Sequence, residues 1–437
     1  MKRRAFVRMA ALSPLLLAGG CPLTLEQGLW AECRTGMDAV ARGLVAESWR
    51  GLRAERVWDM HAHIFGNGRS GGGIHVEPEF DRPTTVKGRV KLAFYRNGGC
   101  VGEDEARFDE QMFVRLSALV AELPPGARVM LLAFDFTHDA NGKRRADRSA
   151  FAVPNDYARR MAARDPQRFE WIASVHPYRE DAVAELERVK AGGARAIKWL
   201  PPAMGIDLTS PRCVPYYQAL KRLDLPLITH AGEEQAVAGV EDHEAGNPLR
   251  LRHPLDEGVR VVAAHCATLG EGADFDRDKN PDKAPRVPNF ELFARLMDER
   301  RYEGLLFGDL SAVTQVNRAG TLPALLTRMP AWAPRLLNGT DYPLPGILPL
   351  FSPRRLVSEG LLDERALPAV RALRETNALL FDFVLKRNLR FGGERIPASV
   401  FETRDFFENQ NRGQARARPR SGPGPAPISG GRVVANG

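Results

Sequence analysis

The stretch "VWDMHAHIFG", residues 57–66, ends an apolar run with two histidines that lie one residue apart. Trp58 and Met60 favour a buried strand. Side chains alternate along a strand with a period of two, so His61 and His63 share one face of it. Two imidazoles on one face can bind the same ion, which makes this stretch a candidate for half of a metal site. The alternative is a polar strand end near solvent.

Seven similar runs follow, and helical patterns lie between most of them. The helical patterns include "EDAVAELERVKAGG" (180–193) and "NFELFARLMDERR" (289–301). Strands that alternate with helices predict a parallel sheet, and eight such units predict an α/β fold of the distorted (β/α)8 (TIM) barrel type. An open doubly wound sheet is the alternative, but it seldom needs eight consecutive units. The eight runs cover residues 56–63, 128–136, 169–176, 194–201, 224–232, 258–266, 303–311 and 335–343.

The barrel is expected to span residues 51–393. Residues 22–50 before it predict a short leader with an amphipathic helix. Residues 394–437 after it are predicted to form a disordered tail, because the Pro, Gly and Arg content of "RGQARARPRSGPGPAPISGG" (412–431) cannot build a core.

The long gap after the first run contains the glycine-rich stretch "GNGRSGGGIH" (66–75). It is too rich in glycine for a helix and lacks the Gly-Lys-Ser/Thr ending of a phosphate loop. It is therefore either an active-site loop or a mobile connector.

The first 21 residues predict a signal peptide. A basic start precedes an apolar run that is too short to span a bilayer. "RRAFVR" (3–8) resembles a twin-arginine signal, and "AGGC" (18–21) resembles a bacterial lipobox, which would make Cys21 the lipidated first residue of the mature chain. We therefore expect a protein exported to the periplasm or cell envelope and held at the membrane by its N-terminal lipid. The alternative is a plain secretory signal with a chance cysteine.

Cysteine spacing gives no support for a cysteine-based zinc site, since no CxxC pair occurs. Export permits disulfides, so Cys33 and Cys100 either pair or remain free. Cys266 lies in an apolar run and is expected to be a buried free thiol.

The formal charge of +8 is concentrated at the two ends of the chain. Four positive residues precede Cys21, and five arginines against one acid follow from Glu408 onward, so the remainder is near neutral. The high pI is thus weak evidence for nucleic-acid binding, and none is expected.

Polar residues gather at the ends of the predicted strands, where barrel enzymes build their active sites. This placement suggests that His61 and His63 belong to a site completed by later strands. The residues at these ends are His61, His63, Asp135, His176, Lys198, His230, His265, Asp309 and Asp341.

Four of these ends lie in motifs that, with one later segment, resemble the metal-dependent amidohydrolase superfamily. The motifs are "DMHAH" (59–63), "THAGE" (229–233), "AAHC" (263–266) and "NGTDYP" (338–343), and the later segment is "ETNALLFDF" (375–383). They are most similar to the branch that includes aminocarboxymuconate-semialdehyde decarboxylase and related decarboxylases, lactonases and hydrolases. The resemblance spans roughly residues 55–385.

This resemblance implies a role for each matching residue. His61, His63 and His230 would be metal ligands, and Asp341 would be both ligand and general base. His265 would position the attacking water or a substrate oxygen. Imidazoles and a carboxylate suit one catalytic Zn²⁺, and Mn²⁺ or Fe²⁺ would also accept them. His265 as a core histidine and Asp341 as a helix cap are the structural alternatives.

Lys198 lies where some amidohydrolases carry a carbamylated lysine that bridges two metals. The branch resembled here usually holds one metal. Lys198 is then expected to contact an anionic substrate group, and Arg69 is a second candidate for that contact.

The sequence therefore predicts a metal-dependent hydrolase that uses a metal-activated water on a small amide, lactone or ester. A metal-dependent non-oxidative decarboxylase is the alternative within the same site. The alternative of another class is a lipoprotein that binds a metal or ligand without turnover.

Overall fold

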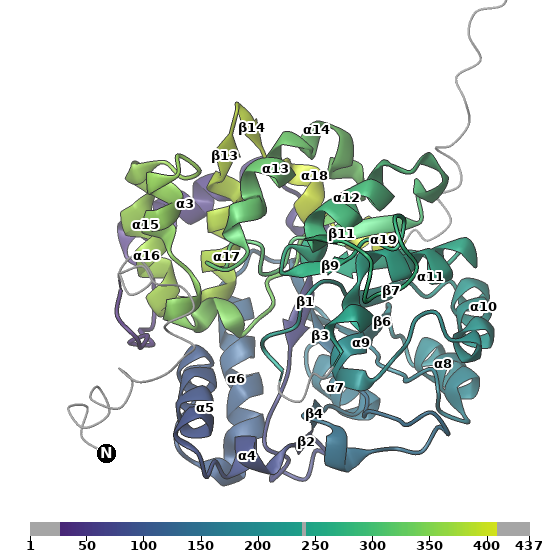
Figure 1. Cartoon of the computed structure of the whole chain (residues 1–437). Coiled ribbons are helices and arrows are strands. Elements are labelled where there is room, and N and C mark those ends of the chain that lie inside the picture. Colours follow the sequence, from purple (N-terminus) through teal and green to yellow (C-terminus); the bar gives the residue numbers. More distant parts are fainter. Residues whose placement is uncertain (1–26, 238–241, 409–437) are drawn as a thin grey trace, which may run out of the picture.

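The computed structural model describes residues 27–237 and 242–408 (Figure 1), so the predicted signal with Cys21 lies outside the described residues. Eight parallel strands surrounded by helices confirm the predicted barrel, and each strand falls within its predicted run. The barrel strands are β1 (Trp58–His63), β3 (Arg128–Leu132), β5 (Phe169–Ile172), β6 (Ile197–Trp199), β7 (Leu227–His230), β8 (Val261–Ala264), β11 (Leu306–Asp309) and β12 (Leu336–Leu337).

The barrel consists of two arcs that meet at two seams. One arc has the order β1-β3-β5 and the other β12-β11-β8-β7-β6. Ala173 pairs with Ile197 across the first seam, and Ala62 pairs with Tyr342 across the second. Each seam has one bridge between its two strands and no continuous ladder, so the barrel is distorted at these two places.

Helices cover the outside of the barrel, and the patterns predicted at 180–193 and 289–301 form α8 and α12. The helices are α3 (Ala39–Ser48), α4 (Pro78–Asp81), α5 (Val86–Gly98), α6 (Phe108–Ala121), α7 (Asn155–Ala162), α8 (Ala182–Ala191), α9 (Pro201–Met204), α10 (Val214–Leu223), α11 (Arg252–Asp256), α12 (Asn289–Asp298), α13 (Leu322–Thr327), α14 (Met329–Trp332), α15 (Pro353–Ser358), α16 (Leu367–Thr376), α17 (Ala378–Asn388), α18 (Ala398–Phe401) and α19 (Arg404–Glu408). Short strands form three antiparallel pairs outside the barrel: β2 (His75–Val76) with β4 (Phe151–Ala152), β9 (Glu271–Ala273) with β10 (Arg286–Pro288), and β13 (Arg390–Phe391) with β14 (Glu394–Arg395).

The folded part of the chain extends beyond residue 393, which corrects the predicted start of the tail. Residues 394–408 form β14, α18 and α19, and Phe407 joins the apolar cluster inside the barrel. Thr403 also donates a hydrogen bond to the Trp58 carbonyl. These apolar contacts explain the order of this segment, and the rest of the predicted tail lies outside the described residues.

Strand β1 contains a bulge, and the bulge changes which side chains face the barrel interior. Asp59 pairs with Val129 and Ala62 with Leu131, so Met60 and His61 together oppose one residue of β3. Trp58 and Met60 belong to the interior apolar cluster. The extra residue shifts the alternation, and His61 also faces the interior.

The leader is fastened to α5, which belongs to the insertion between β1 and β3. Cys33 and Cys100 form a disulfide, and the backbone amide and carbonyl of Ala31 are both bonded to the Asn97 side chain. The predicted helix of the leader is α3. Cys213 and Cys266 are buried free thiols, as expected for Cys266.

The glycine-rich stretch 66–75 runs beside α6 without regular structure until β2. The Asp109 carboxylate accepts hydrogen bonds from the amides of Asn67 (2.7 Å) and Gly68 (3.2 Å), which holds the start of the stretch in place. Arg69 forms ion pairs with Asp81 and Glu105. Arg69 is thus already neutralised, which argues against its expected contact with a substrate carboxylate.

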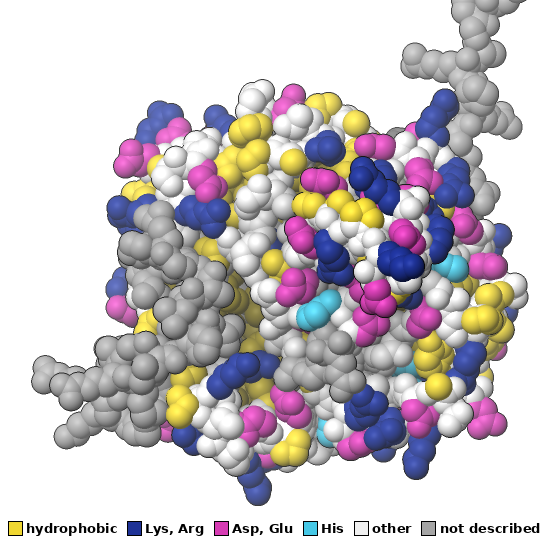
Figure 2. All heavy atoms as spheres, viewed as in Figure 1, with side chains coloured by type: hydrophobic (Ala, Val, Ile, Leu, Met, Phe, Trp, Pro, Cys, Tyr) yellow, Lys and Arg dark blue, Asp and Glu magenta, His cyan; other side chains and the backbone are white. Residues whose placement is uncertain are grey.

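Basic and acidic side chains intermix over the face of the molecule shown in Figure 2. Within the described part of the chain, no helix has both the length and the apolar character needed to cross a bilayer.

The disulfide is expected to contribute measurably to stability. Cys33→Ser with Cys100→Ser should lower the free energy of unfolding by about 2–4 kcal/mol, because the bond closes a long loop in the unfolded chain. Urea unfolding without reductant measures the difference. Reductant should destabilise the wild type to the same extent and leave the double variant unchanged. Equal unfolding midpoints for oxidised wild type and variant would contradict this assignment.

Candidate metal centre

The seam between β12 and β1 brings Asp341 to the two histidines of β1. The Asp341 amide donates to the His61 carbonyl (2.7 Å), and the His63 amide donates to the Tyr342 carbonyl (2.9 Å). These two hydrogen bonds hold the segment after β12 against the end of β1. Three side chains far apart in sequence therefore converge at one end of the barrel.

His61, His63 and Asp341 form the first candidate metal-binding group. One ligand atom of each residue lies within 4.8 Å of those of the other two. Asp341 Oδ1 is 3.2 Å from His63 Nε2 and 3.6 Å from His61 Nε2. His61 and Asp341 are buried, whereas the His63 side chain is 23% exposed, so the group has an open side.

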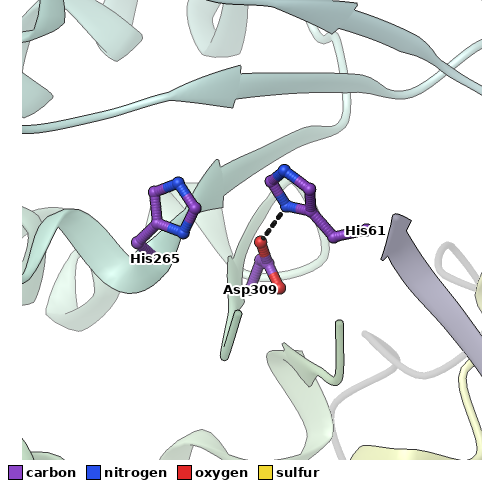
Figure 3. Close-up of side chains that lie close together, drawn as sticks. All are labelled: His61, His265 and Asp309. Atoms are coloured by element: carbon purple, nitrogen blue, oxygen red, sulfur yellow. Dashed lines mark hydrogen bonds and ion pairs between the residues drawn. The ribbon is translucent and has the colours of Figure 1, made fainter. Parts of the chain in front are cut away.

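A second group shares His61 and adds His265 and Asp309 (Figure 3). His61 Nδ1 lies 2.7 Å from Asp309 Oδ2. Ser311 Oγ donates to Asp309 and lies 3.0 Å from His61 Nδ1 and 2.8 Å from His265 Nδ1. One imidazole thus faces Asp309 with Nδ1 and Asp341 with Nε2.

These contacts determine which ring nitrogens carry protons. An ionised Asp309 requires the proton of His61 on Nδ1, so the Nε2 lone pair can act as a metal ligand in place of its contact with Lys198 Nζ. His265 Nδ1 lies 3.1 Å from the Ser311 carbonyl, which can only accept, so this nitrogen is protonated too. His265 therefore also keeps its Nε2 lone pair.

The charges of the site favour a metal-binding form. Burial lowers the pKa of His61 and, more strongly, that of His265, so both imidazoles are neutral. Burial opposes ionisation of Asp341, but the hydrogen bond from His63, whose Nε2 lies 3.2 Å from Oδ1, helps to hold the pKa of Asp341 well below its usual range. Neutral imidazoles beside an ionised carboxylate are the protonation states in which these groups bind metals.

His230 lies on the wall of the same pocket but outside both groups. Its Nδ1 is 3.3 Å from Glu234 Oε2, and its Nε2 is 3.2 Å from the Glu233 carbonyl. Its ring centre is 5.2 Å from that of His265. Burial lowers the pKa of His230 to about 4, so this ring is neutral as well. Coordination through Nε2 would replace the contact with Glu233.

Lys198 reaches the centre from β6. Its Nζ lies 3.2 Å from His61 Nε2, and its side chain is almost fully buried. Burial lowers the pKa of Lys198 to about 8, although Asp309, Asp341 and Glu234 oppose this shift. The structure thus places Lys198 beside the predicted ligands.

Two of the strand-end residues lie apart from the centre. Asp135 accepts from the His176 amide (2.9 Å) and pairs with Arg179 (3.1 Å). His176 Nε2 is 3.0 Å from the Met204 carbonyl, and burial lowers the pKa of His176 to about 3. Both residues stabilise the loops beside the centre.

Three polar residues of the centre had no role assigned from the sequence. Asp309 was recognised only as a strand end, and Ser311 and Glu234 were not recognised at all. Ser311 follows Asp309 by two positions, so the period of a strand could have indicated that both face the same side. Glu234 carries no such signal, because its contact with His230 depends on the path of the loop after β7.

The backbone is strained at two places in the centre, residues 265–267 and Asp341. His265, Cys266 and Ala267 have φ values of 57°, 47° and 52°, and Asp341 has φ of 62°, all in the left-handed region that residues other than glycine rarely adopt. Such strain gathers at functional sites, where the surrounding structure holds it.

The residues fit a divalent transition metal. His61, His63 and Asp341 supply two nitrogens and a carboxylate oxygen, a donor set that Zn²⁺, Mn²⁺ and Fe²⁺ accept. Asp309 orients the His61 ligand, as carboxylates commonly do for metal-binding histidines.

The comparisons with known proteins agree with this architecture. A family model described as Amidohydrolase matches residues 58–346. No curated protein matches the chain.

Several solved structures match the chain at low identity. An uncharacterised TIM-barrel protein from Bordetella bronchiseptica is 15% identical, with 73% of this chain and 98% of that chain covered and a TM-score of 0.43. A probable 2-pyrone-4,6-dicarboxylic acid hydrolase from Acinetobacter baumannii is 14% identical, with 74% and 97% covered and a TM-score of 0.41. A 5-carboxyvanillate decarboxylase from Sphingomonas paucimobilis is 14% identical, with 76% and 97% covered and a TM-score of 0.39. Likeness at this level does not identify a reaction.

The centre is expected to hold about one metal ion per chain. His61→Ala with His63→Ala should abolish metal binding, because it removes both imidazole ligands of the first group. Elemental analysis of purified protein measures the stoichiometry, and His253→Ala is the control, since His253 is exposed. Unchanged metal content in the double variant would rule out this centre.

The same measurement tests the state of Lys198. As an ammonium it cannot coordinate, so Lys198→Ala should keep about one metal per chain. A fall from two metals to one or none, with bicarbonate restoring the wild type alone, would instead show a carbamylated bridging lysine.

Proposed function

This chain belongs to the amidohydrolase family, and we propose that it is a metal-dependent hydrolase of a small amide, lactone or ester. The observation that carries the proposal is the convergence of His61, His63 and Asp341 on the open side of one pocket. A divalent metal bound there would act as a Lewis acid and lower the pKa of a water molecule.

Asp341 is suited to the proton transfers of hydrolysis. It is ionised and buried, and its Oδ1 faces the ligand histidines while its Oδ2 lies 3.9 Å from His265 Nδ1. As general base it would take a proton from water as the new C–O bond forms. It would then return that proton to the leaving nitrogen or oxygen as the old bond breaks.

His265 and Lys198 would complete the reaction site. His265 lines the pocket, and its unprotonated Nε2 would accept a hydrogen bond from the attacking water or a substrate group. Lys198 as an ammonium would bind an anionic or carbonyl oxygen of the substrate close to the reacting carbon. The rest of the pocket wall is mostly apolar and suits a small organic substrate.

Asp341→Asn is expected to reduce kcat by about 10²–10⁴-fold, because an amide cannot accept the proton that general-base catalysis transfers. A panel of amides, lactones, esters and carboxylic acids, assayed with the metal-loaded enzyme, would identify the reaction. Asp282→Asn changes an exposed acid in the same way and is the matched control.

Two outcomes of this screen would overturn the proposal. Release of carbon dioxide without hydrolysis of any substrate would make the enzyme a decarboxylase. Metal binding without turnover across the panel would favour a binding lipoprotein.

The twin-arginine pattern and Cys21 further support an exported, lipid-anchored protein. The disulfide between Cys33 and Cys100 agrees with this location, because disulfides persist in oxidising compartments. A twin-arginine route would also allow the centre to acquire its metal before export.

Cys21→Ser should release the protein from the membrane fraction, because the lipid would lose its attachment point. Replacement of Arg3 and Arg4 by lysine should leave unprocessed protein in the cytoplasm. Fractionation and immunoblotting of the two variants measure both effects. Normal export of the lysine variant would rule out the twin-arginine route.

A further inference from the structure

The wall of the pocket at the metal centre carries a basic residue that forms no ion pair with any described residue. Lys91 of α5 lines this pocket together with the centre residues. Its Nζ makes no hydrogen bond or ion pair with any residue in 27–237 or 242–408. Its closest electrostatic partners, Glu77 and Glu234, do not reach ion-pair distance.

The other charged side chains of the pocket are mostly committed to partners. Lys198 contacts His61. Glu234 contacts His230 and accepts hydrogen bonds from the amides of Ala236 (2.5 Å) and Val237 (2.9 Å). Lys198 is assigned to the reacting end of the substrate, so among the described residues Lys91 is the cation of this pocket left to bind a second group of the ligand.

Tyr95 provides a second donor on the same face of α5. It follows Lys91 by four residues, so both side chains lie on one side of the helix, and both line the pocket. Its ring packs edge-on against Phe65 (5.5 Å) and Phe80 (5.7 Å), which fixes its position. Burial raises the pKa of Tyr95 well above its usual value, so the hydroxyl stays protonated and can donate.

Apolar side chains surround these two donors. The pocket is lined by Phe65, Phe80, Phe134, Phe151, Leu200 and Leu344. Removal of Lys91 from water costs free energy unless an anion compensates, and burial does lower the pKa of Lys91. The wall thus offers a hydroxyl and a cation without an ion-pair partner among the described residues, both beside apolar side chains.

We propose that Lys91 and Tyr95 bind an anionic oxygen group of the substrate, at the end opposite the bond that is broken. The substrate class is then a small amide, lactone or ester with an apolar or aromatic body and a distal carboxylate. The identity of the reacting bond in this substrate class rests on the proposed hydrolase function. The anion site itself does not depend on that function. Lys91 and Tyr95 select the substrate by binding its anionic group and take no part in the chemical step.

Binding of an unreactive anion tests the site independently of turnover. The probe is phenylmethanesulfonate, an anion that coordinates metals poorly, and benzyl methyl sulfone is its neutral counterpart. Titration calorimetry on the metal-loaded protein should show about 10- to 100-fold tighter binding of the sulfonate, as expected for charge-assisted hydrogen bonds. A wild type without this preference would overturn the proposal.

Matched variants separate the anion site from other effects. Lys91→Gln should abolish the preference and Lys91→Arg should keep most of it, because the arginine restores the charge. Arg89→Gln removes an exposed positive charge two residues earlier, on a different side of α5, and should leave the preference unchanged. Tyr95→Phe should weaken sulfonate binding by about 3- to 10-fold, the effect of one lost hydrogen bond.

The variant Glu77→Gln tests whether Lys91 binds the ligand or forms a structural ion pair with Glu77. Removal of this nearby negative charge should maintain or strengthen sulfonate binding. If Glu77→Gln abolishes the preference as Lys91→Gln does, the two residues form a structural pair and the proposal is wrong. A retained preference in Lys91→Gln would also overturn it.

The kinetic arm separates failure of the site from failure of the function. For a hydrolysed ester with a distal carboxylate, Lys91→Gln should raise KM and leave kcat nearly unchanged, whereas the matching carboxamide ester should be unaffected. Sulfonate binding that depends on Lys91, together with no hydrolysis of any substrate, would retain the anion site and reject the hydrolase.

Discussion

One buried carboxylate holds the centre together. Asp59 Oδ1 accepts hydrogen bonds from the amide of His61 (3.1 Å) and the amide of Thr340 (2.9 Å), and Oδ2 accepts from the Thr340 hydroxyl (2.6 Å). His61 lies in the bulge of β1, where the Asp59 side chain binds its amide. The same carboxylate fixes the residue before Asp341, so the positions of His61 and Asp341 depend on each other. Burial raises the pKa of Asp59 to about 6, although its hydrogen bonds oppose this shift.

The fold could be predicted from the sequence because its signals are local and repeated. Each barrel strand is an apolar run, and residues such as His230 and Asp341 mark where the strands end. The bulge could not be predicted, because Met60 and His61 read as ordinary alternating positions. Residues 394–408 were assigned to the tail because the Pro, Gly and Arg content of the segment after them decided the prediction. Only the contacts with the barrel reveal Phe407 as part of the core.

The centre could be predicted only in part, for a related reason. His61, His63 and Asp341 lie within motifs at strand ends. Their convergence was expected because a barrel brings the ends of its strands together. The sequence could not show which charged side chains form ion pairs, because this depends on which side chains come into contact in the fold. Arg69 lies in a conspicuous loop and is neutralised by two acids, whereas Lys91 lies in an unremarkable helix and has no ion-pair partner among the described residues.

The disulfide connects the proposed location with the proposed specificity. Lys91 and Tyr95 belong to α5, and the end of this helix is joined to the leader by Cys33–Cys100 and by the Asn97 side chain. The residues of the metal centre lie on barrel strands and the loops that directly follow them, and need no such bond. An oxidising compartment would therefore act mainly on the wall that selects the substrate, and reduction would loosen α5 while His61 and Asp341 stay in place. On this view, the catalytic end of the pocket depends on the barrel itself, and the selective end depends on the disulfide between Cys33 and Cys100.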